Sequence, residues 1–215
     1  MSLEGKNKKP FSYISKEVLS KNFQNKDFNK TSSYYSNFSH SKFENTSFLA
    51  TKFKWCTFYE ATFKNCTITG AHFKKCNLEN FSFEGCVIRA AVFESCKMNG
   101  ISFKNYYIEL DQFKKYPDLD LSTCYTKPLT LSIFSQKLLD VVESLRSNDF
   151  IRRSMVLLIK KNRINLIALK KLVDKFGEEM LIKSLPLLPN IIKNQFYTLS
   201  YLEKILSDLE TSSNI

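Results

Sequence analysis

The sequence has few of the residues on which many enzymes depend. It contains only five glycines and two histidines. It has no glycine-rich phosphate loop, no HExxH zinc motif and no GxSxG nucleophile motif. We therefore predict no cofactor, no catalytic residue and no enzymatic activity. A site without a motif, in the C-terminal half, is the alternative.

Long apolar runs are also missing. No stretch approaches the ~18 consecutive apolar residues of a membrane span. No apolar h-region follows the opening "MSLEGKNKKP". We expect a soluble, cytoplasmic protein with no membrane span and no cleaved signal peptide. Delivery into a host cell is compatible with this pattern and would leave no trace in it.

Acidic residues are outnumbered, and the net charge is +11. The excess is +4 over residues 1–30, +4 over residues 31–115 and +3 over residues 116–215. A basic excess spread so evenly is more typical of a solvated surface than of a dedicated polyanion site.

The first half of the sequence has a five-residue repeat. Every fifth residue from 38 to 108 is apolar, and 13 of the 19 phenylalanines share this register. A helix repeats every 3.6 residues and a strand every two, so the chain must turn a corner once per repeat. Two residues before most of these positions stands a small side chain, and Gly or Asn often stands two residues after, as a corner requires.

Stretches such as "CTFYE-ATFKN-CTITG-AHFKK-CNLEN" resemble the pentapeptide-repeat family. We therefore expect a bacterial protein. The resemblance implies a right-handed quadrilateral β-helix, a mainly β solenoid with four pentapeptides per coil. It covers residues 36–108 firmly and residues 21–35 and 109–113 loosely, and we predict the β-helix over residues 11–115. Whether residues 11–35 form a first coil or a helical cap is left open by the sequence.

Cysteine recurs in the small-residue position. With 20 residues per coil, Cys56, Cys76 and Cys96 should stack on one side, and Cys66 and Cys86 on the opposite side. Stacked thiols could bind metal or form disulfides. Because alanine alternates with cysteine and no CxxC or nearby histidine is present, we favour packing of free thiols, with no metal. Cys124 lies outside the pattern.

The same arithmetic places a basic strip with the single tryptophan on one face. The candidate interaction residues are Lys52, Lys54, Trp55, His72, Lys74, Lys75, Lys114 and Lys115, interrupted by Glu94. Such a strip suits a phosphate backbone or an acidic protein, and a solvated corner is the plain alternative. A second face should alternate in charge through Glu44, Lys64, Glu84 and Lys104. No acidic neighbour is expected for His40 or His72.

Beyond residue 115 the pattern changes. Residues 116–128 read as a linker, and residues 129–210 as an α-helical domain between a basic disordered tail, 1–10, and a second tail, 211–215. Helices are predicted over 131–145, 149–162, 164–176, 178–185 and 190–210. These form a small bundle or a cap on the open solenoid end. The basic clusters at 152–153, 160–163 and 170–171 read as solvated faces.

The function favoured by these features is a non-enzymatic scaffold that presents a rigid β-helix face. The helical domain would cap the solenoid, bind a protein partner, or bind a second copy as a homodimer. The resemblance also implies an alternative, a gyrase- or topoisomerase-binding resistance protein, but those solenoids are acidic and this one is basic. Binding of nucleic acid or an anionic surface through the strip is a further alternative.

Overall fold

The computed structural model describes residues 10–104, 106–107, 119, 121–122, 124–125, 129–159 and 161–213. The chain divides into two compact units, Met1–Thr126 and Lys127–Ile215. This division falls inside the predicted linker. Among the helices so described, none has the length and apolar character that a bilayer crossing needs.

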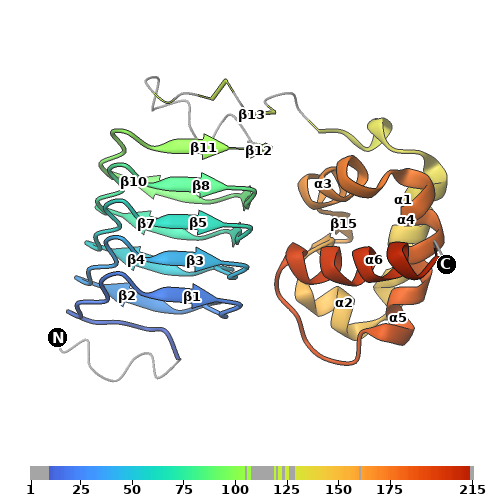
Figure 1. The fold of residues 1–215 in the computed structure, drawn as a ribbon, viewed down its shortest axis with the longest axis horizontal. Coiled ribbons are helices and arrows are strands. Elements are labelled where there is room, and N and C mark those ends of the chain that lie inside the picture. The colour runs from blue at the N-terminus through green and yellow to red at the C-terminus, as the bar shows by residue number, and fades with distance from the viewer. Residues whose placement is uncertain are drawn as a thin grey trace. The chain divides into compact units, whose positions relative to one another are not determined.

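The first unit is a β-solenoid built from short parallel strands that lie one above another (Figure 1). Three of its four sides carry strands, paired in the orders β1-β3-β5-β8-β11, β10-β7-β4-β2 and β6-β9. The strands are β1 (Asn22–Gln24), β2 (Ser32–Tyr34), β3 (Lys42–Glu44), β4 (Lys52–Lys54), β5 (Thr62–Lys64), β6 (Thr67–Thr69), β7 (His72–Lys74), β8 (Ser82–Glu84), β9 (Val87–Arg89), β10 (Val92–Glu94) and β11 (Ser102–Lys104).

Each strand pairs with the residues 20 positions away. Phe43 lies opposite Phe63, and Phe63 opposite Phe83. The fourth side has single bridges in the same register, from Asn37 to Thr57 and from there to Asn77. The predicted β-solenoid, with four pentapeptides per coil and helices after it, is confirmed.

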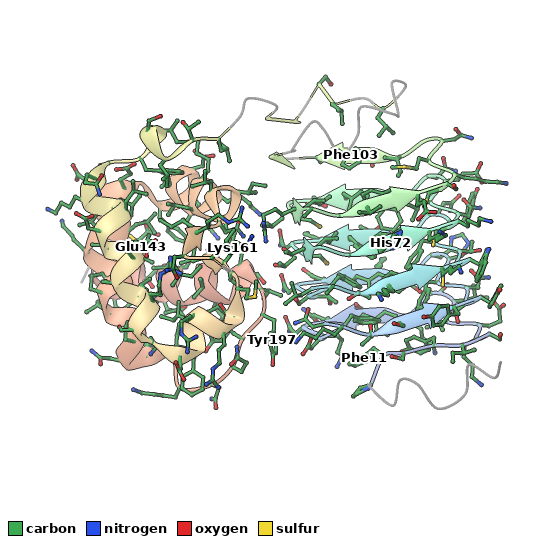
Figure 2. The ribbon with its side chains drawn as sticks, turned by 180° about the vertical axis from the view of Figure 1, so that it is seen from behind. Phe11, His72, Phe103, Glu143, Lys161 and Tyr197 are labelled. Carbon is green, nitrogen blue, oxygen red and sulfur yellow. The ribbon has the colours of Figure 1, made fainter. Side chains whose placement is uncertain are left out.

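The segment that the sequence left open is a true first coil. Ile14 bridges Tyr34, Glu17 bridges Asn37, and β1 pairs with β3. The Phe11 ring stacks on the Phe28 ring at a centroid distance of 4.8 Å. Figure 2 labels Phe11 and Phe103 at opposite ends of the stack. Residues 11–35 therefore form a coil of the solenoid and not a helical cap.

The interior is a column of stacked aromatic rings. Phe43, Phe53, Phe63 and Phe73 are fully buried. The rings contact one another from coil to coil, stacked for Phe53 on Phe73 at 5.1 Å and edge to face for Phe43 on Phe63 at 4.6 Å. Because each buried phenylalanine removes a large apolar area from water and gains ring contacts, this column supplies much of the stability of the unit.

Every corner has a left-handed backbone. All residues at five-residue intervals from 15 to 100 have positive φ, between +49° and +67°. Only some are Gly or Asn, and the others include Tyr35, Trp55 and Lys75. A left-handed residue other than glycine costs ~1–2 kcal/mol, so the coil pairing must offset that cost at each such corner. Glycine and asparagine in the sequence therefore marked only some of the corners.

Two further strands lie near the C-terminal end of the first unit. β12 (Tyr106–Tyr107) pairs in parallel with β13 (Cys124–Tyr125). The predicted linker thus contains a strand. The rest of the segment predicted as the last repeats and the linker lies largely outside the described residues.

The second unit is mainly helical, as predicted. Its elements are η2 (Leu131–Ile133), α1 (Gln136–Ser144), η3 (Leu145–Ser147), α2 (Asp149–Ser154), β14 (Leu158–Ile159), β15 (Arg163–Ile164), α3 (Leu166–Phe176), α4 (Glu178–Ser184), η4 (Leu185–Leu187), α5 (Leu188–Ile191) and α6 (Leu199–Ser213). Helices α1, α2 and α3 begin at capping side chains: Ser135, Asn148 and Asn165 each accept a hydrogen bond from a backbone N–H three residues on.

One predicted helix, over 149–162, was wrong in its second half. α2 ends at Ser154, followed by Met155 with φ +58°. The chain then forms the β14–β15 hairpin, whose turn holds Lys161 and Asn162 at φ +60° and +50°. Two successive residues with positive φ cannot occur inside an α-helix.

The predicted helix over 190–210 and the predicted tail over 211–215 also need correction. The helix begins at Leu199 and runs through Ser213. Between α5 and α6, Ile192 takes an extended conformation, and Ile192 and Phe196 are buried. The apolar residues over 192–198 are therefore spaced as in a helix, but they bury one side of an irregular segment.

Two glycine corners allow a matched test of this geometry. Gly70 and Gly85 both have positive φ, but an added Cβ would meet nothing within 4 Å at Gly70, whereas at Gly85 it would lie 2.5 Å from Asn65 Oδ1. We expect Gly70→Ala to lower the free energy of unfolding by about 1 kcal/mol. Gly85→Ala should cost about 1 kcal/mol more, because the Asn65 amide must leave its rotamer.

Urea unfolding followed by circular dichroism measures both changes. A double-mutant cycle with Asn65→Ala should recover the extra cost of Gly85→Ala, since it removes the clashing atom. Equal losses for the two glycine variants would show that the Asn65 contact is unimportant.

Candidate functional site

The small-residue positions form ladders of hydrogen-bond donors inside the solenoid. Thr46 Oγ1 donates to the Phe23 carbonyl at 2.8 Å, and Cys66 Sγ donates to the Phe43 carbonyl at 3.3 Å. Both carbonyls lie 23 positions earlier. Hydroxyl and thiol groups thus fill one position with one geometry. The expectation that this position must be small and apolar was incomplete, because its serine, threonine and cysteine side chains also donate to the preceding coil.

The five cysteines of the repeats, Cys56, Cys66, Cys76, Cys86 and Cys96, carry thiols with no disulfide and stack as predicted. The Cys66 backbone N–H donates to Cys86 Sγ at 3.3 Å, which places one above the other. Burial raises the pKa of the Cys66 thiol well above its ordinary value. Among the described residues, no group of three or more His, Cys, Asp or Glu side chains could hold a metal ion. The burial of four of these thiols fits packing as small apolar side chains.

The predicted basic strip is a continuous surface over two adjacent strands. Lys52 of β4 lies opposite His72 of β7, and Lys54 lies opposite Lys74. Trp55 and Lys75 occupy the corners that follow these strands. Figure 2 marks His72 within this part of the stack. Lys114 and Lys115 lie outside the described residues, so we define the basic strip from here on as Lys52, Lys54, Trp55, His72, Lys74 and Lys75.

An aromatic pair extends the basic strip by one coil. The rings of Tyr35 and Trp55 stack with centroids 4.6 Å apart and planes 8° apart. Lys54 Nζ lies 3.8 Å from the centre of the Trp55 ring. Tyr35 is 51% exposed. Tyr35 was missed in the sequence, although it stands 20 positions before Trp55 and therefore on the same corner.

Glu94 neutralises one end of the basic strip. His72 Nε2 lies 3.1 Å from Glu94 Oε2, and Lys74 Nζ contacts Glu94 Oε1. The Lys74 ammonium, followed by His72, holds the pKa of the Glu94 carboxyl below its usual value. The side chains are about one-third to two-fifths exposed, so solvent screens these pairs. The strip is hence most strongly basic at Lys52 and Lys54.

The expectation that both histidines lack an acidic neighbour was wrong. His72 faces Glu94, and His40 Nδ1 lies 3.2 Å from Glu60 Oε2. Glu60 stands 20 positions after His40, on the same corner of the next coil. The 20-residue spacing, applied to corner residues, would have found this pair in the sequence.

On the second face, one pair of oppositely charged neighbours forms a contact. Lys64 Nζ lies 3.9 Å from Glu84 Oε1, and β3, β5, β8 and β11 bring Glu44, Lys64, Glu84 and Lys104 into one row. A single exposed pair at this distance contributes little, roughly 0–1 kcal/mol. This row is consistent with a structural role.

Comparison with known proteins identifies the repeat. A family model described as pentapeptide repeats matches residues 36–74 and 68–105. No curated protein matches the chain. Solved structures resemble parts of the chain at 9–18% sequence identity.

Three of those structures illustrate the range of sequence identity and coverage. Rfr23, a pentapeptide repeat protein from the cyanobacterium Cyanothece 51142, is 9% identical over 42% of this chain and 90% of its own, with a TM-score of 0.28. A pentapeptide repeat protein of the Arabidopsis thaliana thylakoid lumen is 18% identical over 46% of this chain and 72% of its own, with a TM-score of 0.21. QnrB1, a plasmid-mediated fluoroquinolone resistance protein, is 13% identical over 54% of this chain and 89% of its own, with a TM-score of 0.19.

The Glu94 contacts predict a pH dependence. Because the folded-state pKa of Glu94 lies below its unfolded value, its ionised form stabilises the fold above the unfolded pKa. This contribution is lost as pH falls through the folded pKa. A carbon-13 NMR titration should give a Glu94 midpoint below that of an unfolded-chain glutamate. Lys74→Met should raise this midpoint, and Lys42→Met on another face should leave it unchanged.

The thiol ladders predict an order of alkylation. Cys96 is partly exposed, whereas Cys56, Cys66, Cys76 and Cys86 are buried. Treatment of the native chain with iodoacetamide, followed by peptide mapping in a mass spectrometer, should show Cys96 labelled before the other four. All five should react in denaturant. Fast labelling of Cys66 in the native chain would contradict the packing described here.

Proposed function

Since residues 36–105 of this chain are pentapeptide repeats, we propose that it is a non-enzymatic protein-interaction scaffold. Its β-solenoid presents a rigid face to a protein partner. The helical unit either caps the solenoid or binds a partner or a second copy. One observation carries the proposal: the stacked Tyr35–Trp55 pair, with Lys54 over it, stands on the outside of the solenoid.

The rigidity of the face supports this proposal. The parallel pairing of β2, β4, β7 and β10 fixes the backbone of each coil against the next. The exposed side chains are thus held in rows before a partner arrives. Preorganised aromatic and basic side chains lose little conformational entropy on binding, and tryptophan and tyrosine are frequent anchors of interfaces.

The charge of the chain argues against the topoisomerase-binding alternative. An acidic rod can imitate the phosphates of duplex DNA, whereas the repeats here have a net excess of lysine and arginine. The strip instead presents ammonium groups, which repel the basic surfaces that DNA-binding enzymes use. Nucleic-acid binding by the strip is the competing candidate and is tested together with the scaffold.

A capture experiment with the full chain tests the scaffold. The immobilised chain should retain a protein from the native lysate after nuclease treatment and a high-salt wash. Trp55→Ala should reduce that retention by at least about tenfold, as expected for an interface anchor. Tyr59→Ala is the matched control, since Tyr59 is a surface aromatic that packs on His40 on a different face.

Circular dichroism shows whether each variant keeps its fold. Retention lost with nuclease would refute the scaffold and identify a nucleic-acid binder. Equal loss in the Tyr59 and Trp55 variants would show that the aromatic corner has no specific role. Capture of a topoisomerase would overturn the charge argument.

A further inference from the structure

The basic strip already shows how it binds a carboxylate. Glu94 of β10 projects over the preceding coil, where His72 Nε2 meets one of its oxygens at 3.1 Å and Lys74 Nζ meets the other. The two donors stand on either side of the buried Phe73, at the outward positions of β7. One carboxylate is thus held by two cationic side chains from a single strand.

The strand one coil earlier has the same two outward positions but no carboxylate. Lys52 and Lys54 of β4 are in register with His72 and Lys74. The residue that stands above Lys54, where Glu94 stands above Lys74, is Lys74 itself. In the part of the chain that the structure describes, neither Lys52 nor Lys54 belongs to an ion pair. This is a donor pair whose carboxylate is not supplied by the next coil.

We propose that Lys52 and Lys54 bind the carboxylate of an acidic segment of a protein partner. An apolar side chain of that segment packs against the exposed Tyr35 ring. This inference rests on the proposed scaffold function and adds the chemistry of its partner. The acidic segment completes on β4 the arrangement that Glu94 completes on β7.

The stacking geometry favours a peptide over a single-stranded nucleic acid. Parallel rings 4.6 Å apart leave no room for an ammonium group between them, so Lys54 covers the face of Trp55 opposite Tyr35. Both faces of the indole are therefore occupied. Single-stranded nucleic acids bind chiefly by stacking bases on free aromatic faces, and this corner offers them only the outer face of Tyr35.

The number of available cations favours a peptide over duplex DNA. Glu94 occupies His72 and Lys74, so among the described residues of the strip Lys52, Lys54 and Lys75 are left for a ligand. Proteins that bind duplex DNA through its backbone commonly make ~6–10 phosphate contacts. Three lysines with a central aromatic pair match instead the small set of anchors that dominates a protein interface.

Selection from a displayed library of short random peptides tests the inference on the full chain. Enriched peptides should be acidic and should carry an aromatic or aliphatic side chain. For such a peptide, Lys52→Gln with Lys54→Gln should weaken binding about tenfold at low salt, within the range that two exposed charge pairs allow. Lys42→Gln, an exposed lysine of β3, is the matched control and should leave binding unchanged.

Glu94→Gln gives a change of opposite sign. It releases His72 and Lys74 for the ligand, so acidic peptides should bind about two- to fivefold more tightly, as expected for one exposed pair. Weakening by this substitution, or no effect, would overturn the proposed equivalence of the two coils. Trp55→Ala is a second probe, and the lysine variants keep the test valid if that chain does not fold.

The outcomes separate the inference from the scaffold function. Enriched peptides that lack acidic residues, or that bind the lysine double variant equally well, would overturn the acidic partner and leave a protein scaffold. If no peptide is enriched, the inference is also overturned. The lysate capture alone would then decide the scaffold function. Tighter binding of a labelled single-stranded or duplex oligonucleotide than of every peptide would overturn both.

Discussion

Parallel pairing between residues 20 positions apart is the interaction on which the solenoid depends. It places Phe63 over Phe43 and under Phe83, and it stacks their corners and outward side chains in the same way. Every surface row and every buried ladder follows from this one register. A slip by one residue would turn the phenylalanines outward and the lysines inward. The column of buried rings therefore holds the register as firmly as the backbone hydrogen bonds do.

The same pairing explains why the corners tolerate residues that otherwise avoid a left-handed backbone. Trp55 and Tyr35 both have positive φ, and stacking of their rings offsets part of that cost. The aromatic pair thus belongs to the architecture and to the candidate interface at once. A surface feature whose position the coil fixes is available to a partner without rearrangement, which supports a scaffold role for this face.

The thiol ladder shows how one position can satisfy two requirements. Cys66 is small enough for the crowded interior and still donates to a carbonyl of the preceding coil, as Thr46 does. Hydroxyl residues fill this position in the early coils, and cysteine or alanine fills it later. Burial raises the pKa of the Cys66 thiol and keeps it protonated, and packing of thiols in the core gives their regular spacing a structural explanation.

The sequence by itself determined the solenoid, because a five-residue apolar period is compatible with no helix or flat strand. The same period, multiplied to 20 residues, placed Lys52, Lys54, Trp55, His72 and Lys74 on one face. It could also have revealed Tyr35 beside Trp55 and Glu60 beside His40, since these pairs obey that spacing. Local pattern was less reliable in the second unit, where residues 155–162 and 192–198 imitate a helical period.

Only the tertiary structure decided which of these neighbours interact. The sequence puts Glu94, His72 and Lys74 on one face, but side-chain direction decides that Glu94 reaches both. The hairpin at Leu158–Ile164 likewise depends on backbone angles at Met155, Lys161 and Asn162 that no apolar period encodes. Periodicity determines where the backbone goes when each repeat has one buried side. Contacts between side chains depend on rotamers and on neighbours from other coils, and these exist only once the coils are stacked.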